Sequence, residues 1–188
     1  GQEQQGMYAP LVIDPAEDDP VRYDREHTIV LSDWTDEDPM DVLRNLKGNG
    51  AYYNYGKRTL PGFVSGLFDD AGATVRDRTS WGGMRMDPTD IADVTGATYS
   101  YLLNGKVPAD NWTGLFQDGE RVRLRFINAA AMSFFDVKIP GLKMTVVQAD
   151  GQDVEPVRVD EFRIAVAETY DVIVRPETGT AYTIFAQS

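Results

Sequence analysis

The second half of the chain alternates between apolar and polar positions in short runs, which is the pattern of strands buried on one face. The clearest run is ERVRLRFI, residues 120–127, in which Val122, Leu124 and Phe126 alternate with three arginines. We therefore predict a half-buried antiparallel strand here, with the arginines on the opposite face from the apolar side chains. This arginine row is the outer face of a strand and not a nucleic-acid stripe.

Seven other segments favour strands because they are short, rich in β-branched and aromatic residues, and bounded by turn signals. Glycine-containing turns fall at Asn104-Gly105, Pro140-Gly141, Asp150-Gly151 and Thr178-Gly179. Repeated short strands with such turns predict an antiparallel sandwich or barrel, in which Tyr170 would have a structural role near a corner. The predicted strands are 27–34, 98–103, 134–139, 144–148, 161–166, 170–174 and 182–186.

Helix signals are confined to two Asp-Pro sites. Asp38 can cap a helix over 38–47, whose Met40, Leu43 and Leu46 would form its buried side. A second short helix is predicted over 87–93. Residues 48–86 hold eight of the 17 glycines and predict the least regular region of the chain. Residues 1–20, acidic and punctuated by prolines, read as a linker.

Composition narrows the possible chemistry. The net charge is −12, which argues against a nucleic-acid or anionic-membrane partner. No apolar run approaches the roughly 18 residues of a membrane helix. The chain has no cysteine and one histidine, His27, which we expect to be a polar residue at a strand edge. Disulfides, thiol catalysis and thiolate metal sites are therefore excluded, and we predict no catalytic and no cofactor-binding residue.

Methionine is the remaining soft metal ligand in the chain. Met84 and Met86 lie two residues apart, so on an extended segment both sulfur atoms would leave the same side and could share one Cu(I) ion. The alternative is that they fill irregular gaps in a core, as methionines commonly do. Met132 and Met144 lie in or beside predicted strands and are expected in the core.

Several stretches, in this order, resemble one protein family. Cupredoxin-type segments are YLLNGK, DGERVRLRFINAA, GLKMTVVQADGQ and AETYDVIV. More particular stretches are REHTIVLSDWTDEDP, YYNYGKRT, MRMDPTDIADVTGATYSYLLNG, IPGLKMTVVQADGQ and VDEFRIAVAETYDVIV. Together they are similar to the copper-resistance protein A branch of the periplasmic multicopper oxidases.

The resemblance implies an all-β fold: an antiparallel β-sandwich or Greek-key barrel of cupredoxin type with short helices. The opening GQEQQGMYAPLVIDP is similar to the segment that follows a His-x-His copper-ligand motif in the family's first domain, with Ala9 where glycine is usual. Residues 1–20 would then be the tail of that preceding cupredoxin domain and a linker, and residues 21–188 the second cupredoxin-like domain.

The resemblance also implies a periplasmic parent protein that oxidises Cu(I) and reduces dioxygen to water. Copper would belong to the parent, with no cofactor in this chain, because a blue copper site needs two histidines and a cysteine. The chain would hold the flanking cupredoxin domains apart, would be inactive alone, and could self-associate through exposed interfaces. The alternatives are a laccase-like oxidase of phenolic or other organic donors and a non-enzymatic β-sandwich interaction module.

Overall fold

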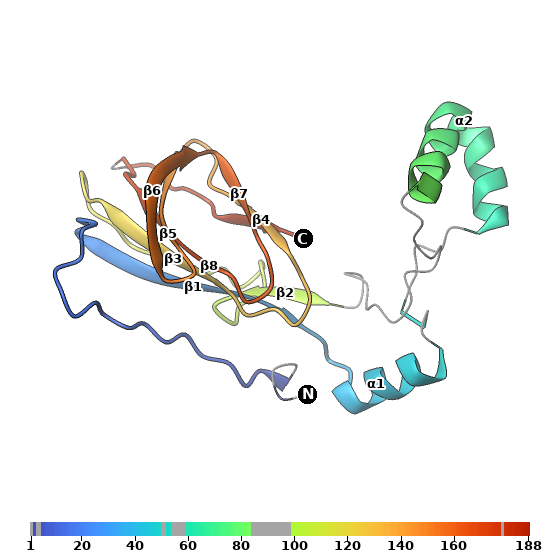
Figure 1. The fold of residues 1–188 in the computed structure, drawn as a ribbon, viewed down its shortest axis with the longest axis horizontal. Coiled ribbons are helices and arrows are strands. Elements are labelled where there is room, and N and C mark those ends of the chain that lie inside the picture. Colours follow the sequence, from blue (N-terminus) through green and yellow to red (C-terminus); the bar gives the residue numbers. More distant parts are fainter. Residues whose placement is uncertain (1, 3–4, 50–51, 54–58, 84–98, 178) are drawn as a thin grey trace. The chain divides into compact units, whose positions relative to one another are not determined.

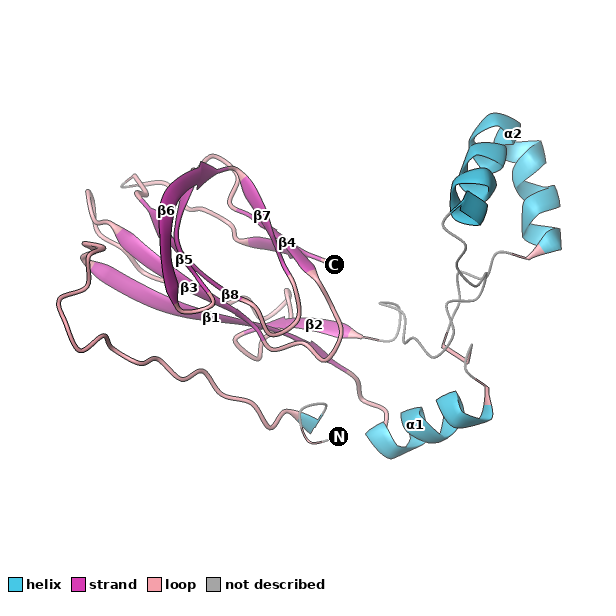
Figure 2. Ribbon diagram, in the orientation of Figure 1, coloured by secondary structure: helices cyan, strands magenta, loops and turns pink. Residues whose placement is uncertain are grey.

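The computed structural model describes residues 2, 5–49, 52–53, 59–83, 99–177 and 179–188. They divide into two compact units, one formed by residues 1–35 with 100–188 and the other by residues 36–99. We call them the β unit and the helical unit. The predicted division at residue 20 stays a prediction. Figures 1 and 2 label the helices and strands.

The β unit is a sandwich of two sheets, which confirms the predicted fold class (Figure 1). The larger sheet has the strand order β2-β1-β3-β8-β5-β6 and the smaller one β7-β4-β9. The two sheets do not close into a barrel. The strands are β1 Arg25–Trp34, β2 Ser100–Leu103, β3 Val122–Asn128, β4 Phe135–Lys138, β5 Met144–Ala149, β6 Gln152–Val159, β7 Glu161–Ile164, β8 Thr169–Val174 and β9 Phe185–Gln187.

Strand β3 lies at the centre of the large sheet and differs from the prediction in two ways. It pairs antiparallel with β8 but parallel with β1, from Arg25 opposite Val122 to Leu31 opposite Asn128. A parallel neighbour requires a long crossover, which here includes the whole helical unit. Its arginine face is also covered, because Arg123 is only 1% exposed.

The core fills the space between the sheets. Phe126 of β3 is fully buried, and its ring meets that of Phe162 edge-on at 5.3 Å between centroids. Such a pair adds to the burial of the two rings. Met144 is fully buried, as predicted from the sequence. The principal core residues are Ile29, Leu31, Leu124, Phe126, Phe135, Val137, Met144, Ile164 and Val172.

The sequence pattern missed one strand. Strand β6 pairs antiparallel with β5 and is exposed over nearly all its length. It forms the edge of the large sheet, the position in a sheet where a proline such as Pro156 is tolerated. An exposed edge strand lacks the alternation that marks a strand with one buried face, so the hydrophobic pattern gave no signal for it.

The turn at Asn104-Gly105 forms as predicted, with positive φ angles of 51° and 75°. Asparagine and glycine tolerate this conformation best. The Asn104 side chain also binds strand β1: its amide oxygen accepts from the Val30 N–H at 2.7 Å and its nitrogen donates to the Thr28 carbonyl at 3.0 Å. The turn therefore anchors β2 to the edge of β1.

In the helical unit, α1 runs over Pro39–Gly48, close to the predicted helix. The Asp38 carboxylate caps it by accepting from the Met40 N–H at 2.7 Å. The predicted buried side is wrong, however, because Met40 is 60% and Leu43 42% exposed. Within the described part of this unit the buried side chain is that of Tyr53, whose hydroxyl donates to Glu37.

Helix α2, Leu60–Gly83, corrects the prediction of an irregular region. It consists of two helical segments that meet at Asp70, where φ is −152°. The Asp70 carboxylate accepts from the Ala73 N–H at 2.9 Å and so caps the second segment. The many glycines predicted an irregular region, but the cap at Asp70 starts a second helical segment within this glycine-rich stretch. The predicted helix 87–93 lies outside the described residues. In the described part of the chain, neither helix has the length and hydropathy needed to cross a membrane.

Candidate functional site

The predicted copper contacts lie outside the described residues, because these do not include Met84 or Met86. Their role stays a prediction. Over the residues that the structure describes, no group of three or more histidine, cysteine or acidic side chains could hold a metal ion.

His27 has a structural environment. It lies on β1, half-buried, with Nε2 at 2.9 Å from the Leu115 carbonyl oxygen. A carbonyl only accepts, so this contact assigns the proton to Nε2, which donates. The ring also meets Trp112 edge-on at 5.6 Å between centroids. His27 thus holds the loop between β2 and β3 against β1.

A buried cluster of charges joins residues before β1 to the large sheet. Arg123 donates to Asp171 of β8 from Nε at 2.8 Å and to Asp19 from Nη1 at 2.5 Å. Its Nη2 donates to the side-chain oxygen Oε1 of Gln148, on β5, at 2.6 Å. Arg125 donates to the same Asp171 oxygen at 3.1 Å. We call Asp19, Arg123, Arg125, Gln148 and Asp171 the Arg123 cluster.

The Arg123 cluster fixes where the N-terminal segment lies. Asp19 is the one member from residues 1–20, and its carboxylate also accepts from the Val21 N–H at 2.7 Å. Farther along this segment, the Tyr8 hydroxyl donates to Ser32 of β1 at 2.6 Å. The segment predicted as a linker is therefore attached to the sheet at two places.

The Asp19 attachment should be sensitive to acid. Burial alone would raise the pKa of the Asp19 carboxyl, but bonds from Val21 and Arg123 outweigh it and hold that pKa below its ordinary value of 3.8. A lowered pKa stabilises the fold above the unfolded-state value, and this contribution is lost as pH falls through the folded value. We expect the free energy of unfolding to drop between about pH 5 and pH 2, and to drop less steeply in Asp19→Asn.

Urea titrations at several pH values would measure this difference. The Asp14→Asn variant, also in the N-terminal segment, is the control and should keep the wild-type pH dependence. Identical slopes for wild type and Asp19→Asn would contradict the assignment of the Asp19 pKa.

A second buried carboxylate, that of Asp33, lies near the C-terminal end of β1. Asp33 is 5% exposed and accepts from the N–H groups of Ala131 and Met132 at 2.9 and 3.3 Å, and from the Ser133 hydroxyl at 2.9 Å. All three donors lie in the loop that follows β3. Asp33 therefore shapes this loop. The signal was an acidic residue inside the apolar strand IVLSDW, which the pattern analysis did not use.

Tyr170 has a packing role in the structure. It is half-buried on β8, with its ring 5.3 Å from that of Phe162. Burial, followed by the nearby charges of Glu168 and Asp150, raises the pKa of the Tyr170 hydroxyl. A raised tyrosine pKa disfavours the ionised form, and the ring packing agrees with the structural role predicted for Tyr170.

An apolar groove of about 650 Å³ in the β unit is a candidate binding surface. Its lining includes residues of β1, β2 and β9 and of the loop that follows β2. Aromatic and aliphatic groups dominate, with few polar side chains such as His27 and Lys106. We call it the β9 groove; its walls include Leu31, Tyr101, Leu103, Trp112, Phe116 and Ile184.

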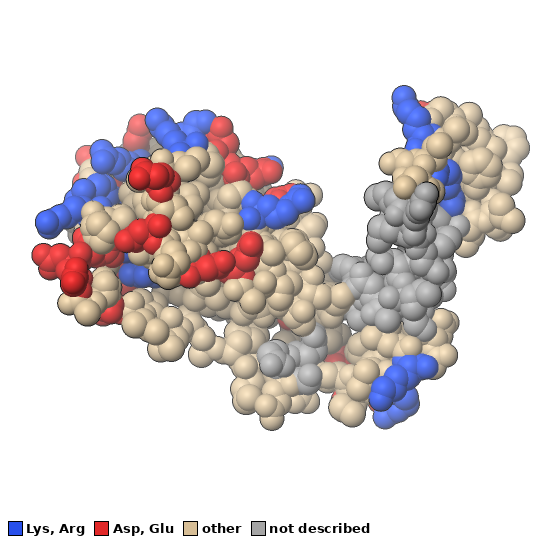
Figure 3. Space-filling model, viewed as in Figure 1, with Lys and Arg blue, Asp and Glu red and all other residues tan. Residues whose placement is uncertain are grey.

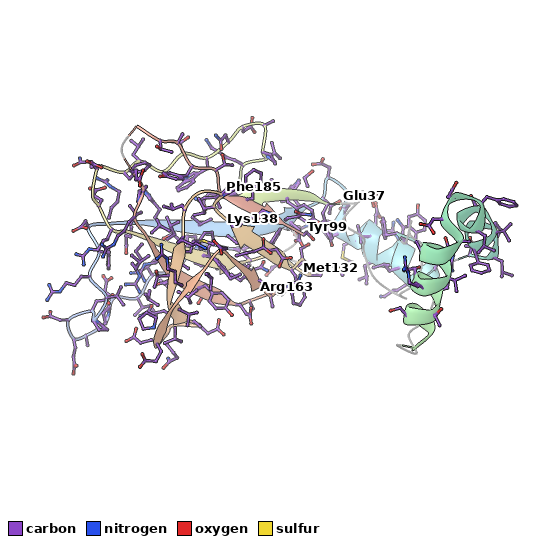
Figure 4. All side chains as sticks on the ribbon, turned by 90° about the horizontal axis from the view of Figure 1, so that it is seen from above. Glu37, Tyr99, Met132, Lys138, Arg163 and Phe185 are labelled. Carbon is purple, nitrogen blue, oxygen red and sulfur yellow. The ribbon has the colours of Figure 1, made fainter. Side chains whose placement is uncertain are left out.

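Unlike the apolar groove, other parts of the β unit's surface carry charged groups of both signs. On the face seen in Figure 3, basic and acidic side chains alternate over the sheets. Many form exposed pairs, such as Arg163 with Asp136 at 2.8 Å on the small sheet. Figure 4 labels Arg163. Exposed pairs of this kind contribute little to stability and indicate no ligand.

Comparison with known proteins identifies the family. Residues 25–188 match the family described as multicopper oxidase. The chain belongs to the multicopper oxidase family. The sequence resemblance is therefore confirmed, and it extends over both the β unit and the helical unit.

The most similar multicopper oxidases include copper-resistance proteins. The chain is 61% identical over all 188 residues to copper resistance protein A of Pseudomonas syringae pv. tomato, and 60% identical to that of Escherichia coli. It is 35% identical over 181 residues to the multicopper oxidase MmcO of Mycobacterium tuberculosis. The chain spans only 31% of the length of each of these three relatives.

Solved multicopper oxidases share the fold. The blue copper oxidase of Nitrosomonas europaea superposes with a TM-score of 0.60 over 97% of this chain and 43% of its own, at 18% identity. The multicopper oxidase Fet3p gives a TM-score of 0.59 over 89% of this chain and 24% of its own, at 20% identity. At these identities the comparison establishes the cupredoxin-like fold alone.

Proposed function

We propose that this chain is a copper-free structural part of a larger periplasmic oxidase that protects cells by oxidising Cu(I). The observation that carries the proposal is the 57–61% identity to three copper resistance A proteins over the whole chain, of which it spans about 31–32%. All three of these relatives are copper-resistance proteins, so the identity favours the copper-resistance branch of the family over the phenol-oxidising alternative.

Ligand chemistry supports the copper-free part of the proposal. One histidine and no cysteine cannot supply the set that a blue copper site requires. His27 also donates to a backbone carbonyl through Nε2, and the buried carboxylates Asp33 and Asp171 already accept from protein groups. These donors are engaged in holding the fold.

The proposed role of the chain is to space the flanking cupredoxin domains. A β-sandwich suits this role because its two packed sheets resist deformation. The Arg123 cluster supports it, since Asp19 fastens the segment before β1 to the large sheet and so fixes the direction from which a preceding domain would enter. The proposed partners are therefore the flanking domains of the same protein.

The test compares the full-length protein with the 188-residue chain, both loaded with copper. We expect the full-length protein to consume dioxygen as Cu(I) disappears and to show intense blue absorption. The 188-residue chain should show neither, because its donors cannot complete a blue site. An oxygen electrode and visible spectroscopy measure these outcomes, with the unloaded full-length protein as control.

Other results would contradict separate parts of the proposal. Rapid turnover of phenols by the full-length protein without Cu(I) oxidation would overturn the copper-oxidising role and favour the laccase-like alternative. A stoichiometric coloured copper adduct on the 188-residue chain would overturn its copper-free role. Inactivity of both proteins under these conditions would favour the non-enzymatic alternative.

A further inference from the structure

Strand β5 lies between β6 and β8 in the large sheet, and the three strands share a row of side chains. Thr145 of β5 pairs with Arg158 of β6 on one side and with Ile173 of β8 on the other. Residues that pair directly project from the same face of a sheet. Their chain neighbours Met144 and Val172 are fully buried in the core, so this row faces away from the core.

A pocket of about 530 Å³ lies over this outer row. Its volume falls within the range of about 300–1,000 Å³ that is typical of small-molecule sites. Its described lining carries three basic side chains, one acidic side chain and two hydroxyl groups. We call it the Arg158 pocket; its lining includes Lys143, Thr145, Arg158, Arg175, Glu177 and Tyr182.

Two of the basic groups in the Arg158 pocket have no carboxylate partner. Over the residues that the structure describes, no carboxylate lies within ion-pair distance of Arg158 or Arg175. Asp24, on which the charge of Arg175 acts at longer range, instead accepts from the Arg121 N–H at 2.8 Å. The other arginines on the strands all pair with carboxylates: Arg25, Arg123, Arg125 and Arg163. Arg158 is therefore an exception among them.

The placement of the two unpaired arginines suits a ligand with two charged ends. An unpaired guanidinium group presents a fork of N–H donors that matches a carboxylate or a phosphate group. Arg158 lies on β6, and Arg175 directly follows β8 on the other side of β5. Neighbouring strands are about 4.8 Å apart, so the two Cα atoms lie roughly 10 Å or more from each other. Two anionic groups on one molecule would engage both arginines at once.

Charge favours a small ligand over a macromolecule. The described lining has a net charge of +2, from three basic side chains and one acidic one, although Asp160 pairs with Lys143 beside it. The whole chain has a net charge of −12. A long polyanion would therefore meet acidic groups beyond the pocket, whereas a small one meets mainly the lining itself.

We propose that the Arg158 pocket binds a small polyanion, a molecule that carries at least two carboxylate or phosphate groups. Arg158 binds one of these groups and Arg175 binds the other. The Thr145 hydroxyl donates to the ligand between them. The carboxylate of Glu177 opposes binding and so limits the affinity. The proposal goes beyond the spacing role and does not depend on the copper chemistry of the longer protein.

The test is isothermal titration calorimetry of the copper-free 188-residue chain at low ionic strength, with citrate and with pyrophosphate as separate probes. Acetate and inorganic phosphate are their single-group counterparts. We expect one-to-one binding of at least one polyanion, about tenfold or more tighter than its counterpart, because two charge-assisted contacts form on one molecule. The polyanion that binds more tightly then shows whether the pocket prefers carboxylate or phosphate groups.

Variants test the assignment of the residues. Arg158→Gln and Arg175→Gln should each weaken binding by about tenfold, because each removes one charge-assisted contact. The control Arg163→Gln removes the same charge from the small sheet and should leave the affinity within about twofold of wild type. Glu177→Gln should strengthen binding by about threefold, because it removes the opposing charge. A misfolded variant would not gain affinity, so this change separates binding from stability.

Four results would overturn the proposal. Neither polyanion could show saturable binding, or acetate and phosphate could bind as tightly as citrate and pyrophosphate. Arg163→Gln could weaken binding as much as Arg158→Gln, which would mean that only the net charge attracts the anion. Finally, a peptide of six glutamates could bind where neither small polyanion does, which would assign the pocket to an acidic protein segment instead.

Discussion

Replacing Arg123 with methionine should lower the free energy of unfolding by about 3 kcal/mol. The side chain is 1% exposed and donates to Asp171, Asp19 and Gln148. Its loss would leave Asp171 buried without its main partner, and removing one member of a buried charge group is strongly destabilising. The effect stays near the lower end of the usual range because Arg125 still faces Asp171 at 3.1 Å. Urea unfolding followed by circular dichroism measures it.

The matched control is Arg163→Met. Arg163 also forms a two-bond pair with a carboxylate, Asp136, but 71% of its side chain is exposed. We expect a much smaller loss of unfolding free energy than for Arg123→Met, since solvent screens such exposed pairs. The double variant Arg123→Met with Asp171→Leu should be less destabilised than the sum of the two single variants. Equal losses for Arg123→Met and Arg163→Met would show that the cluster contributes no more than a surface pair.

Replacing Phe126 with alanine should cost about 3–5 kcal/mol of unfolding free energy. The ring is fully buried between the sheets and contacts Phe162 edge-on. Truncation removes buried apolar area and leaves a cavity that the paired strands on either side cannot close, because β3 is bonded to both β1 and β8. We expect the urea midpoint to fall while the slope of the transition stays unchanged.

Phe134→Ala is the control for this prediction. Phe134 precedes β4 and is 53% exposed, so its truncation should change the free energy of unfolding by about 0.5 kcal/mol or less. A loss of similar size in both variants would mean that the sheets do not form the single packed core described above.

Local sequence signals predicted the elements that depend on their own residues. Alternation located β3, and a short run rich in β-branched and aromatic residues located β8. The Asp-Pro signal located α1, since its cap bond joins Asp38 to Met40, two residues away. The same signals failed for β6, an exposed edge strand held by pairing with β5, and for α2, where Asp70 caps a second segment within a glycine-rich stretch.

For the candidate site, too, some features follow from the sequence alone and others do not. The sequence alone determined that the chain lacks the cysteine and the second histidine of a blue copper site, because ligand identity is a property of composition. It also determined the family, because the similarity is spread over nearly every segment. Copper contacts at Met84 and Met86 stay a prediction from the sequence, since both residues lie outside the described residues.

Only the tertiary structure decided which polar residues are buried together and where apolar surface remains uncovered. Arg123 looked like one of three equivalent arginines, but its partners Asp19 and Asp171 lie 104 and 48 residues away along the chain. The β9 groove likewise brings together residues that are far apart in the sequence, such as Leu31, Tyr101 and Ile184. Strand order and long-range pairing are set by how the elements pack, so no local pattern of residues encodes them.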